Sequence, residues 1–138
     1  MIQPYLYFDG NCRKAVEFYA NVFNVEQQPI MTYGEGPRNP DYPLSEEDKN
    51  RVMHTFIMIG SSMVMFSDIN KGDSFVQGNN ISLTYVSNDD NEIRDIFTKL
   101  SAGGEVLLDL GESFFSKLYG IVKDQFGIIW QMLLPTEH

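Results

Sequence analysis

Two stretches of the chain repeat one order of residues: a short apolar run, a polar turn, and a stripe of apolar positions three and four residues apart. In the first stretch the aromatic run 5–8 suits a pleated strand, and Asp9, Gly10 and Asn11 supply a turn with Asn11 as helix N-cap. The stripe that follows predicts an amphipathic helix: Cys12, Ala15, Val16, Tyr19, Val22 and Phe23.

The second stretch begins with a strand pattern at residues 80–86 and continues with capping residues at 87–90. Asp89 and Glu92 resemble a capping box, and Gly103-Gly104 is typical of a helix end. A single offset superimposes the two stretches without a gap, and we interpret this as an internal duplication. Five pairs coincide: Leu6 with Leu83, Asn11 with Asn88, Val16 with Ile93, Tyr19 with Ile96, and Phe23 with Leu100.

The remaining pattern predicts further strands and one long loop. Residues 34–51 are rich in Gly and Pro and then charged, which indicates a mobile or functional segment such as a lid, with one helical turn possible at 45–50. A turn is expected at residues 111–113. The expected strands are 25–33, a hairpin of 52–59 and 62–67, and 105–110, 114–123 and 127–134.

Each half therefore reads strand, helix, strand, strand, strand. Four strands with a helix on one face leave the other face open, and two such sheets joined edge to edge would curve around a cleft. We predict an α+β fold of two βαβββ modules that form an open, curved mixed sheet around this cleft. The chain is expected to be one domain, with module 1 at about 1–68, a linker at about 69–79 and module 2 at about 80–138.

Strand alternation separates the residues beneath the helices from those that face the cleft. In the second module the apolar set must meet the helix, which leaves the cleft to Asn80, Ser82 and Thr84. The repeat offset assigns the same direction to Gln3, Tyr5 and Tyr7. Tyrosine side chains there would offer an apolar wall with a hydroxyl group at its rim.

Charge and composition exclude several partners. The formal net charge is −9, which disfavours nucleic acid and anionic membranes because both require basic patches. No apolar run approaches the roughly 20 residues of a membrane span, and the first strand begins too early for a signal peptide. Cys12 is the only cysteine, so we expect no internal disulfide, a reducing cytoplasm and a buried structural thiol.

Three stretches carry a family resemblance: residues 4–19, residues 52–68 and residues 123–130. They resemble the glyoxalase/bleomycin-resistance/dioxygenase, or vicinal oxygen chelate, superfamily, and within it the PhnB-like group. The resemblance implies paired βαβββ modules, an open cleft and a homodimer. It does not imply methyl transfer, because the chain has no glycine-rich nucleotide loop and is too short for the usual fold that binds the methyl donor.

Superfamily enzymes such as glyoxalase I hold a divalent metal through His and Glu side chains on the first and last strands of each module. Carried over one at a time, these positions match Gln3, Asn80, Gln131 and Met65, or Ser67 if the strand register is shifted. Amides and a thioether supply neither anionic charge nor imidazole. At the positions where the resemblance places metal ligands, this chain therefore has side chains that bind metals poorly. We expect no metal and no other cofactor.

His54 is the candidate catalytic residue, either as a base or as a group that orients a ligand, and a hydrogen-bonded structural histidine is the alternative. The first hypothesis is a metal-free, small-molecule-binding protein, in which the loop covers a cleft lined by Gln3, Tyr5, Tyr7, His54, Met65, Asn80, Ser82 and Gln131. The competing hypothesis is a lyase, isomerase or dioxygenase-type enzyme that uses His54 or a weakly bound divalent metal. A third is a dimeric scaffold without a ligand.

Two neighbouring positions receive structural interpretations. Trp130 is adjacent to Gln131 and so should point the other way, under the helix. Asp68 ends a strand before the linker and is interpreted as a turn former.

Overall fold

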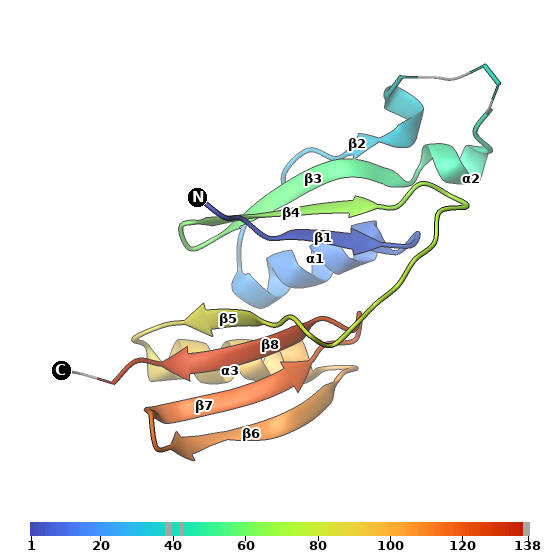
Figure 1. The fold of residues 1–138 in the computed structure, drawn as a ribbon. Helices are drawn as coiled ribbons and strands as arrows, with labels where there is room; N and C mark the ends of the chain where they lie inside the picture. Colours follow the sequence, from blue (N-terminus) through green and yellow to red (C-terminus); the bar gives the residue numbers. More distant parts are fainter. Residues whose placement is uncertain (38–39, 42, 137–138) are drawn as a thin grey trace. The chain divides into compact units, whose positions relative to one another are not determined.

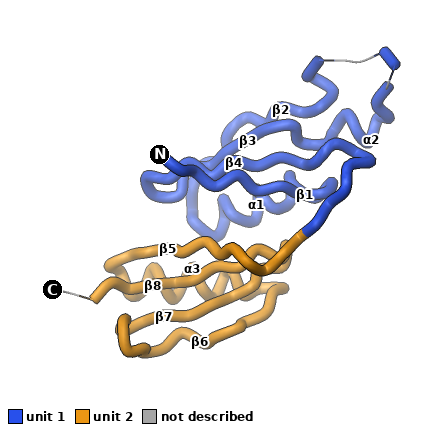
Figure 2. The backbone as a smooth tube through the Cα atoms, viewed as in Figure 1, with its two compact units in different colours: residues 1–76 blue, residues 77–138 orange. Residues whose placement is uncertain are grey.

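The computed structural model describes residues 1–37, 40–41 and 43–136. The chain divides into two compact units, residues 1–76 and residues 77–138 (Figure 2). Each unit contains a four-stranded mixed sheet and one helix of 12 residues. The predicted α+β fold with two βαβββ modules is confirmed.

Unit 1 has the strand order β1-β4-β3-β2, in which β1 runs parallel to β4 and the other pairs are antiparallel (Figure 1). Its elements in chain order are β1 (Tyr5–Phe8), α1 (Cys12–Phe23), β2 (Met31–Thr32), the short 3-10 helix η1 (Tyr33–Glu35), α2 (Glu46–Lys49), β3 (Val52–Ile59) and β4 (Ser62–Asp68).

Unit 2 repeats this topology with the order β5-β8-β7-β6, and β5 runs parallel to β8. Leu6 pairs with Phe66 in unit 1, and Leu83 pairs with Trp130 in unit 2, so the predicted equivalence of Leu6 and Leu83 extends to the strands beside them. The elements of unit 2 are β5 (Leu83–Val86), α3 (Asp90–Ser101), β6 (Glu105–Ser113), β7 (Ser116–Lys123) and β8 (Ile129–Leu134).

Each long helix buries the predicted apolar stripe against one face of its sheet. On α1, Cys12, Val16 and Tyr19 are fully buried, and the Tyr19 ring stacks on Phe66 of β4 with the ring centroids 5.8 Å apart. On α3, Ile93 and Leu100 are fully buried as well. The opposite face of each sheet is not covered by the long helix of its own unit. No helix among the described residues is long and apolar enough to cross a membrane.

The contacts of Asp68 change two predictions, that Asn11 caps α1 and that Asp68 is a turn former. Asn11 occupies the N-cap position but makes no side-chain cap hydrogen bond. The buried Asp68 carboxylate takes this role: its Oδ1 accepts hydrogen bonds from Gly10 N–H at 2.7 Å and Cys12 N–H at 3.1 Å, while its Oδ2 accepts from Val52 N–H at 2.9 Å. Asp68 is therefore a clamp between three chain segments rather than a turn former.

The start of α3 is capped by its own N-cap residue. The Asp89 carboxylate accepts hydrogen bonds from Asn91 N–H at 3.0 Å and Glu92 N–H at 3.2 Å, as predicted. The reciprocal hydrogen bond of a capping box, from Asp89 N–H to the Glu92 carboxylate, is not formed in this described segment. Glu92 instead accepts from the Tyr85 hydroxyl and from Ser87 Oγ–H. The Asp89 N–H donates to Ser87 Oγ at 3.1 Å.

Several predicted boundaries are wrong. The strand expected at 25–33 is reduced to Met31–Thr32, because the segment before it includes Pro29, which cannot donate to a ladder and whose carbonyl accepts from Thr55 Oγ–H. The turn expected at 111–113 lies inside β6, where Gly111 pairs with Tyr119 at a register shift, and the chain reverses at residues 114–115 instead. β5 begins at Leu83 rather than at residue 80.

The long loop is described except for residues 38–39 and 42. Its predicted helical turn is confirmed as α2, where the Ser45 hydroxyl accepts a hydrogen bond from Asp48 N–H at 3.1 Å. The predicted hairpin of β3 and β4 is confirmed as well, with Ile59 paired to Ser62 at its turn.

Candidate functional site

The uncovered face of the unit 1 sheet carries four of the predicted site residues. Phe66 points toward α1, so its neighbours on β4 point the other way. Met65 pairs with Tyr5 on β1 and with Phe56 on β3, and directly paired residues share a face. Tyr7 and His54 lie two residues along these strands and therefore share that face. The predicted assignment of Tyr5, Tyr7, His54 and Met65 to one surface agrees with the observed register.

Tyr5, Tyr7 and His54 form a group in contact, which we call the Tyr–His cluster. The rings of Tyr5 and Tyr7 stack with centroids 4.9 Å apart, and the Tyr5 ring lies 5.9 Å from the His54 ring. The Tyr5 hydroxyl and His54 Nδ1 are 3.3 Å apart, a long hydrogen bond whose direction depends on the imidazole tautomer. The tyrosines remain 37% and 55% exposed. The cluster therefore presents stacked rings with polar groups to solvent.

Gln3 lies before β1, and its hydrogen bond is directed elsewhere. The side-chain amide donates to Met1 Sδ, two residues away, at 3.1 Å in an exposed contact. Gln3 is thus placed next to the strand that carries Tyr5, but its hydrogen bond does not involve the Tyr–His cluster.

A second polar group lies on the uncovered face of the unit 2 sheet, centred on Gln131. The Gln131 amide donates to Ser82 Oγ at 3.0 Å, and its Oε1 accepts from the Tyr119 hydroxyl at 2.5 Å. The adjacent Trp130 is buried and points to the opposite face, as predicted, where its indole N–H donates to Asp124 Oδ2 at 2.9 Å. The structure thus brings together Gln131 and Ser82, two of the predicted residues.

Sequence reasoning missed Tyr119. Its strand β7 lies antiparallel to β8, with Ile121 paired to Gln131, so Tyr119 is two residues along on the same face. The alternation of β7 contains this signal, but it can be used only once the pairing of β7 with β8 is known. Asn80, by contrast, is exposed and precedes β5.

The register identifies the unit 1 residue that corresponds to Gln131. Gln131 pairs with Thr84, and the repeat offset relates Thr84 to Tyr7, which pairs with Ser67. Ser67, the alternative named from the sequence, is therefore the equivalent of Gln131, whereas Met65 corresponds to Ile129. Ser67 is buried.

The side chains at the inherited metal positions do not fit a transition metal. They are the amides of Gln3, Asn80 and Gln131 and the hydroxyl of Ser67 or the thioether of Met65, all of them neutral. Among the described residues, no three His, Cys, Asp or Glu side chains are grouped so that they could hold a metal ion. We therefore derive no step of chemistry through a metal.

Cys12 is not placed to act as a nucleophile. The side chain is fully buried on the apolar stripe of α1, as predicted. Burial raises the pKa of the thiol far above its ordinary value, and the nearby Asp68 carboxylate raises it further. The thiol therefore remains protonated at neutral pH, and its part is in packing.

Solved structures show which class of proteins shares this fold. The chain resembles protein PA1353 from Pseudomonas aeruginosa at 28% identity, with a TM-score of 0.84 and 96% of each chain covered. A PhnB protein from Bacillus cereus, described as a putative 3-demethylubiquinone-9 3-methyltransferase, is also 28% identical, with a TM-score of 0.77 over 96% of this chain and 97% of that one. The fosfomycin resistance protein FosX from Listeria monocytogenes, at 13% identity and a TM-score of 0.66, covers 99% of this chain and 92% of its own.

These likenesses define the fold as that of the glyoxalase/bleomycin-resistance superfamily, which confirms the resemblance inferred from sequence. The model of a protein family described as 3-demethylubiquinone-9 3-methyltransferase matches residues 1–133. The chain belongs to this family, the PhnB-like group of the superfamily. Protein YjdN of Escherichia coli K12 is 26% identical over 138 residues, which covers 95% of this chain and 92% of YjdN.

Proposed function

We propose that this protein binds a small molecule against the uncovered face of the unit 1 sheet, without the help of a transition metal. The observation that supports this proposal is the Tyr–His cluster, where stacked tyrosine rings and an imidazole remain partly open to solvent. Aromatic side chains arranged in this way with a few polar groups are typical of ligand sites. The rings would provide the apolar surface, and the Tyr5 hydroxyl and His54 would orient the ligand.

The Gln131 group supplies a second polar surface, which belongs to unit 2. Its amide is already held by Ser82 and Tyr119, so its orientation is fixed before any ligand arrives. A preorganised amide can recognise a hydroxyl or carbonyl group at little entropic cost. We include Gln131 among the proposed ligand-binding residues and test it by a variant of its own.

The competing proposal, an enzyme, rests on His54. Its Nδ1 is engaged by the Tyr5 hydroxyl, which leaves Nε2 to exchange a proton with a bound molecule. Methyl transfer, the reaction in the family description, is not the function that we propose. Each unit is a four-stranded mixed sheet with one long helix, and the sequence contains no glycine-rich nucleotide loop that would hold a methyl donor.

The first experiment is elemental analysis of protein purified without chelator, paired with thermal shifts in Ni, Zn, Mn, Co and Fe(II). A metal at a hundred times its dissociation constant would add about 2.7 kcal/mol of stability, which the scan would register. We expect no stoichiometric metal and no shift. One metal per chain together with a raised melting temperature would contradict the metal-free proposal and favour an enzyme.

The second experiment is a ligand screen observed by NMR of the protein, with variants that remove one group each. We expect His54→Ala and Tyr5→Phe to weaken binding of hits that perturb the Tyr–His cluster. Phe75→Ala is the matched control. Phe75 is also a partly exposed aromatic residue, but it belongs to the segment that connects β4 to β5 and not to either sheet. Equal weakening by Phe75→Ala, or no hits at the cluster, would contradict the proposal. Gln131→Ala reports separately on unit 2.

We also propose a homodimer, as the family resemblance implies. The edge strand β6 supports it, because the adjacent residues Val106, Leu107 and Leu108 are all at least 40% exposed. An edge strand with apolar side chains is prone to pair with another chain. Light scattering after gel filtration should give twice the chain mass of 15.8 kDa, and a mass of one chain would contradict this.

A further inference from the structure

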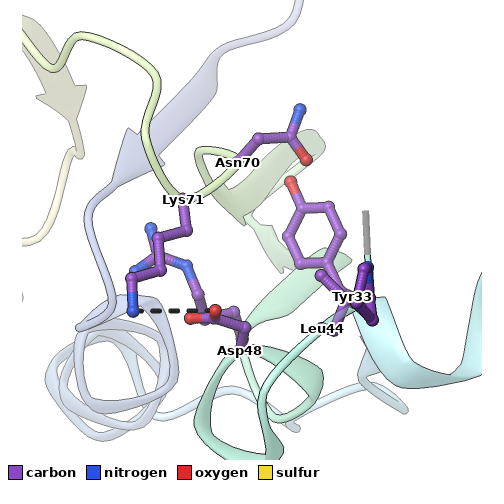
Figure 3. A pocket seen from close by; sticks show the side chains of 7 residues that line it. Tyr33, Leu44, Asp48, Asn70 and Lys71 are labelled. Carbon is purple, nitrogen blue, oxygen red and sulfur yellow. Dashed lines mark ion pairs between the residues drawn. The ribbon is translucent and has the colours of Figure 1, made fainter. Parts of the chain in front are cut away.

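Unit 1 contains a cavity that does not involve the Tyr–His cluster. It lies at the foot of the long loop, has a volume of about 510 Å³, and is lined by residues from η1, the loop, α2 and the segment after β4. Figure 3 shows the side chains that surround it. None of the ligand-binding residues predicted from the sequence is among them. The lining residues are Tyr33, Pro43, Leu44, Asp48, Arg51, Asn70 and Lys71.

Arg51 is the fixed positive charge of this cavity. Its Nη2 donates to Asp9 Oδ1 and to the carbonyl oxygen of Ile69, both at 2.8 Å, and the side chain is only 13% exposed. Its Nε–H is buried and has no acceptor among the described residues. Burial lowers the pKa of Arg51, but the hydrogen bond to Asp9 and the nearby carboxylates raise it overall, so the guanidinium stays charged.

Lys71 is the movable positive charge. Its ammonium group lies 3.7 Å from the Asp48 carboxylate, beyond hydrogen-bond distance (Figure 3). Lys71 is 62% exposed, whereas Asp48 is 13% exposed. Such a loose pair contributes little to stability, and the flexible lysine can turn toward another anion at small cost.

One side of the cavity is apolar and already partly ordered. The Tyr33 hydroxyl donates to the backbone carbonyl of Asp68 at 2.8 Å, which fixes the ring at the cavity wall. Leu44 is 37% exposed and Pro43 is exposed beside it. Covering these side chains with an apolar group would remove their surface from water, which is favourable.

We propose that this cavity is a second ligand site that binds a small amphipathic carboxylate, with an apolar or aromatic body against Tyr33 and Leu44 and its single negative charge between Arg51 and Lys71. A monoanion fits better than a phosphate dianion. Asp48 lines the cavity, and the Asp9 carboxylate is bonded to Arg51, so a second negative charge on the ligand would be repelled. This site is additional to the proposed function at the Tyr–His cluster.

The test is an NMR titration of the isotopically labelled full chain with 3-phenylpropionate. The neutral 3-phenylpropanol and the dianionic phenyl phosphate serve as comparison probes. We expect 3-phenylpropionate to shift the resonances of Tyr33, Leu44 and Lys71 at lower concentration than either comparison probe. Equal binding of the alcohol, or tighter binding of the phosphate, would overturn the assignment of a carboxylate site.

Charge variants then assign the binding to the cavity. Lys71→Gln should weaken 3-phenylpropionate about two- to fivefold, and Asp48→Asn should strengthen it by a similar factor, as expected for partly exposed charges. Lys14→Gln, which removes an exposed lysine on α1, is the matched control and should change nothing. Shifts confined to Tyr5, Tyr7 and His54 would overturn this proposal and leave the proposed function intact. Shifts confined to the cavity would support it independently of that function.

Discussion

Each unit contains a buried carboxylate that accepts three hydrogen bonds, but the two carboxylates connect different parts of the chain. Asp68 binds N–H groups of Gly10, Cys12 and Val52, which are up to 58 residues away. Asp124 accepts hydrogen bonds from the backbone N–H groups of Phe126 and Ile128 and from the indole N–H of Trp130, which is 6 residues away. The same chemistry joins remote segments in unit 1 and shapes one local turn in unit 2.

The largest loss of stability is expected for Asp68→Asn, which removes the carboxylate that joins remote segments of unit 1. The amide would place an N–H group against one of the N–H donors that the carboxylate now accepts, leaving a buried donor unsatisfied. We expect a loss of about 2–4 kcal/mol in the free energy of unfolding, measured by urea denaturation.

Asp124→Asn is the matched variant, because the carboxylate of Asp124 also accepts three hydrogen bonds. We expect a smaller loss of about 1–2 kcal/mol, because only the indole N–H of Trp130 is a buried donor here, whereas the N–H groups of Phe126 and Ile128 are part-buried and can reach water. A loss equal to or above that of Asp68→Asn would show that the separation of the partners along the chain does not matter.

The next effect, a loss of about 1 kcal/mol in the free energy of unfolding, distinguishes the starts of the two long helices. Asp89→Ala removes a side chain that accepts two backbone hydrogen bonds, and such a change typically costs about 1 kcal/mol. Asn11→Ala removes a side chain that makes no cap hydrogen bond, because Asp68 accepts from the N–H of Cys12 instead. Its cost should stay within about 0.5 kcal/mol. Equal costs in thermal or urea unfolding would contradict this division of roles.

The smallest effect concerns alkaline stability in unit 2. Burial, together with the hydrogen bond to Glu92, raises the pKa of Tyr85 from 10.0 to about 12. Between these values the unfolded chain loses this proton while the folded chain keeps it, so stability falls as the pH rises from about 10 to about 12. Tyr85→Phe should remove this part of the decline in melting temperature. Tyr7→Phe, at an exposed tyrosine, is the control, and an unchanged slope in Tyr85→Phe would contradict the prediction.

Local patterns predicted most of the fold, and tertiary contacts account for what they missed. The stripes of α1 and α3 were readable because helix burial has a fixed period, and Ser45 marked α2 through its capping chemistry. The predicted extent of the strand at 25–33 was wrong, because only Met31–Thr32 of this stretch forms a strand. The role of Asp68 could not be predicted, since its three donors come from segments that only the folded sheet brings together.

The candidate sites also contain residues that local patterns predict and residues that only the tertiary structure reveals. Alternation and the repeat offset predicted that Tyr5 and Tyr7 point the same way, and His54 was a separate candidate for the same cleft. The structure adds the shared face and the contacts between the three. Tyr119 required the pairing of β7 with β8. For the cavity, the sequence indicated only that the loop 34–51 could be functional. It gave no signal for Arg51 and Lys71, because isolated basic residues in loops are ordinarily solvated and only the fold places these two beside Leu44.

The parallel pairing of the first and last strands in each unit has a consequence for the timing of synthesis. β1 leaves the ribosome early, but its partner β4 is the last strand of unit 1 to be made, and the clamp at Asp68 is the final residue of that strand. The nascent chain must therefore hold β1 and the start of α1 unpaired until about residue 68 has emerged. Unit 1 should then close in one late step, so β1 and the start of α1 stay open to chaperones and proteases for as long as the residues up to β4 are being made.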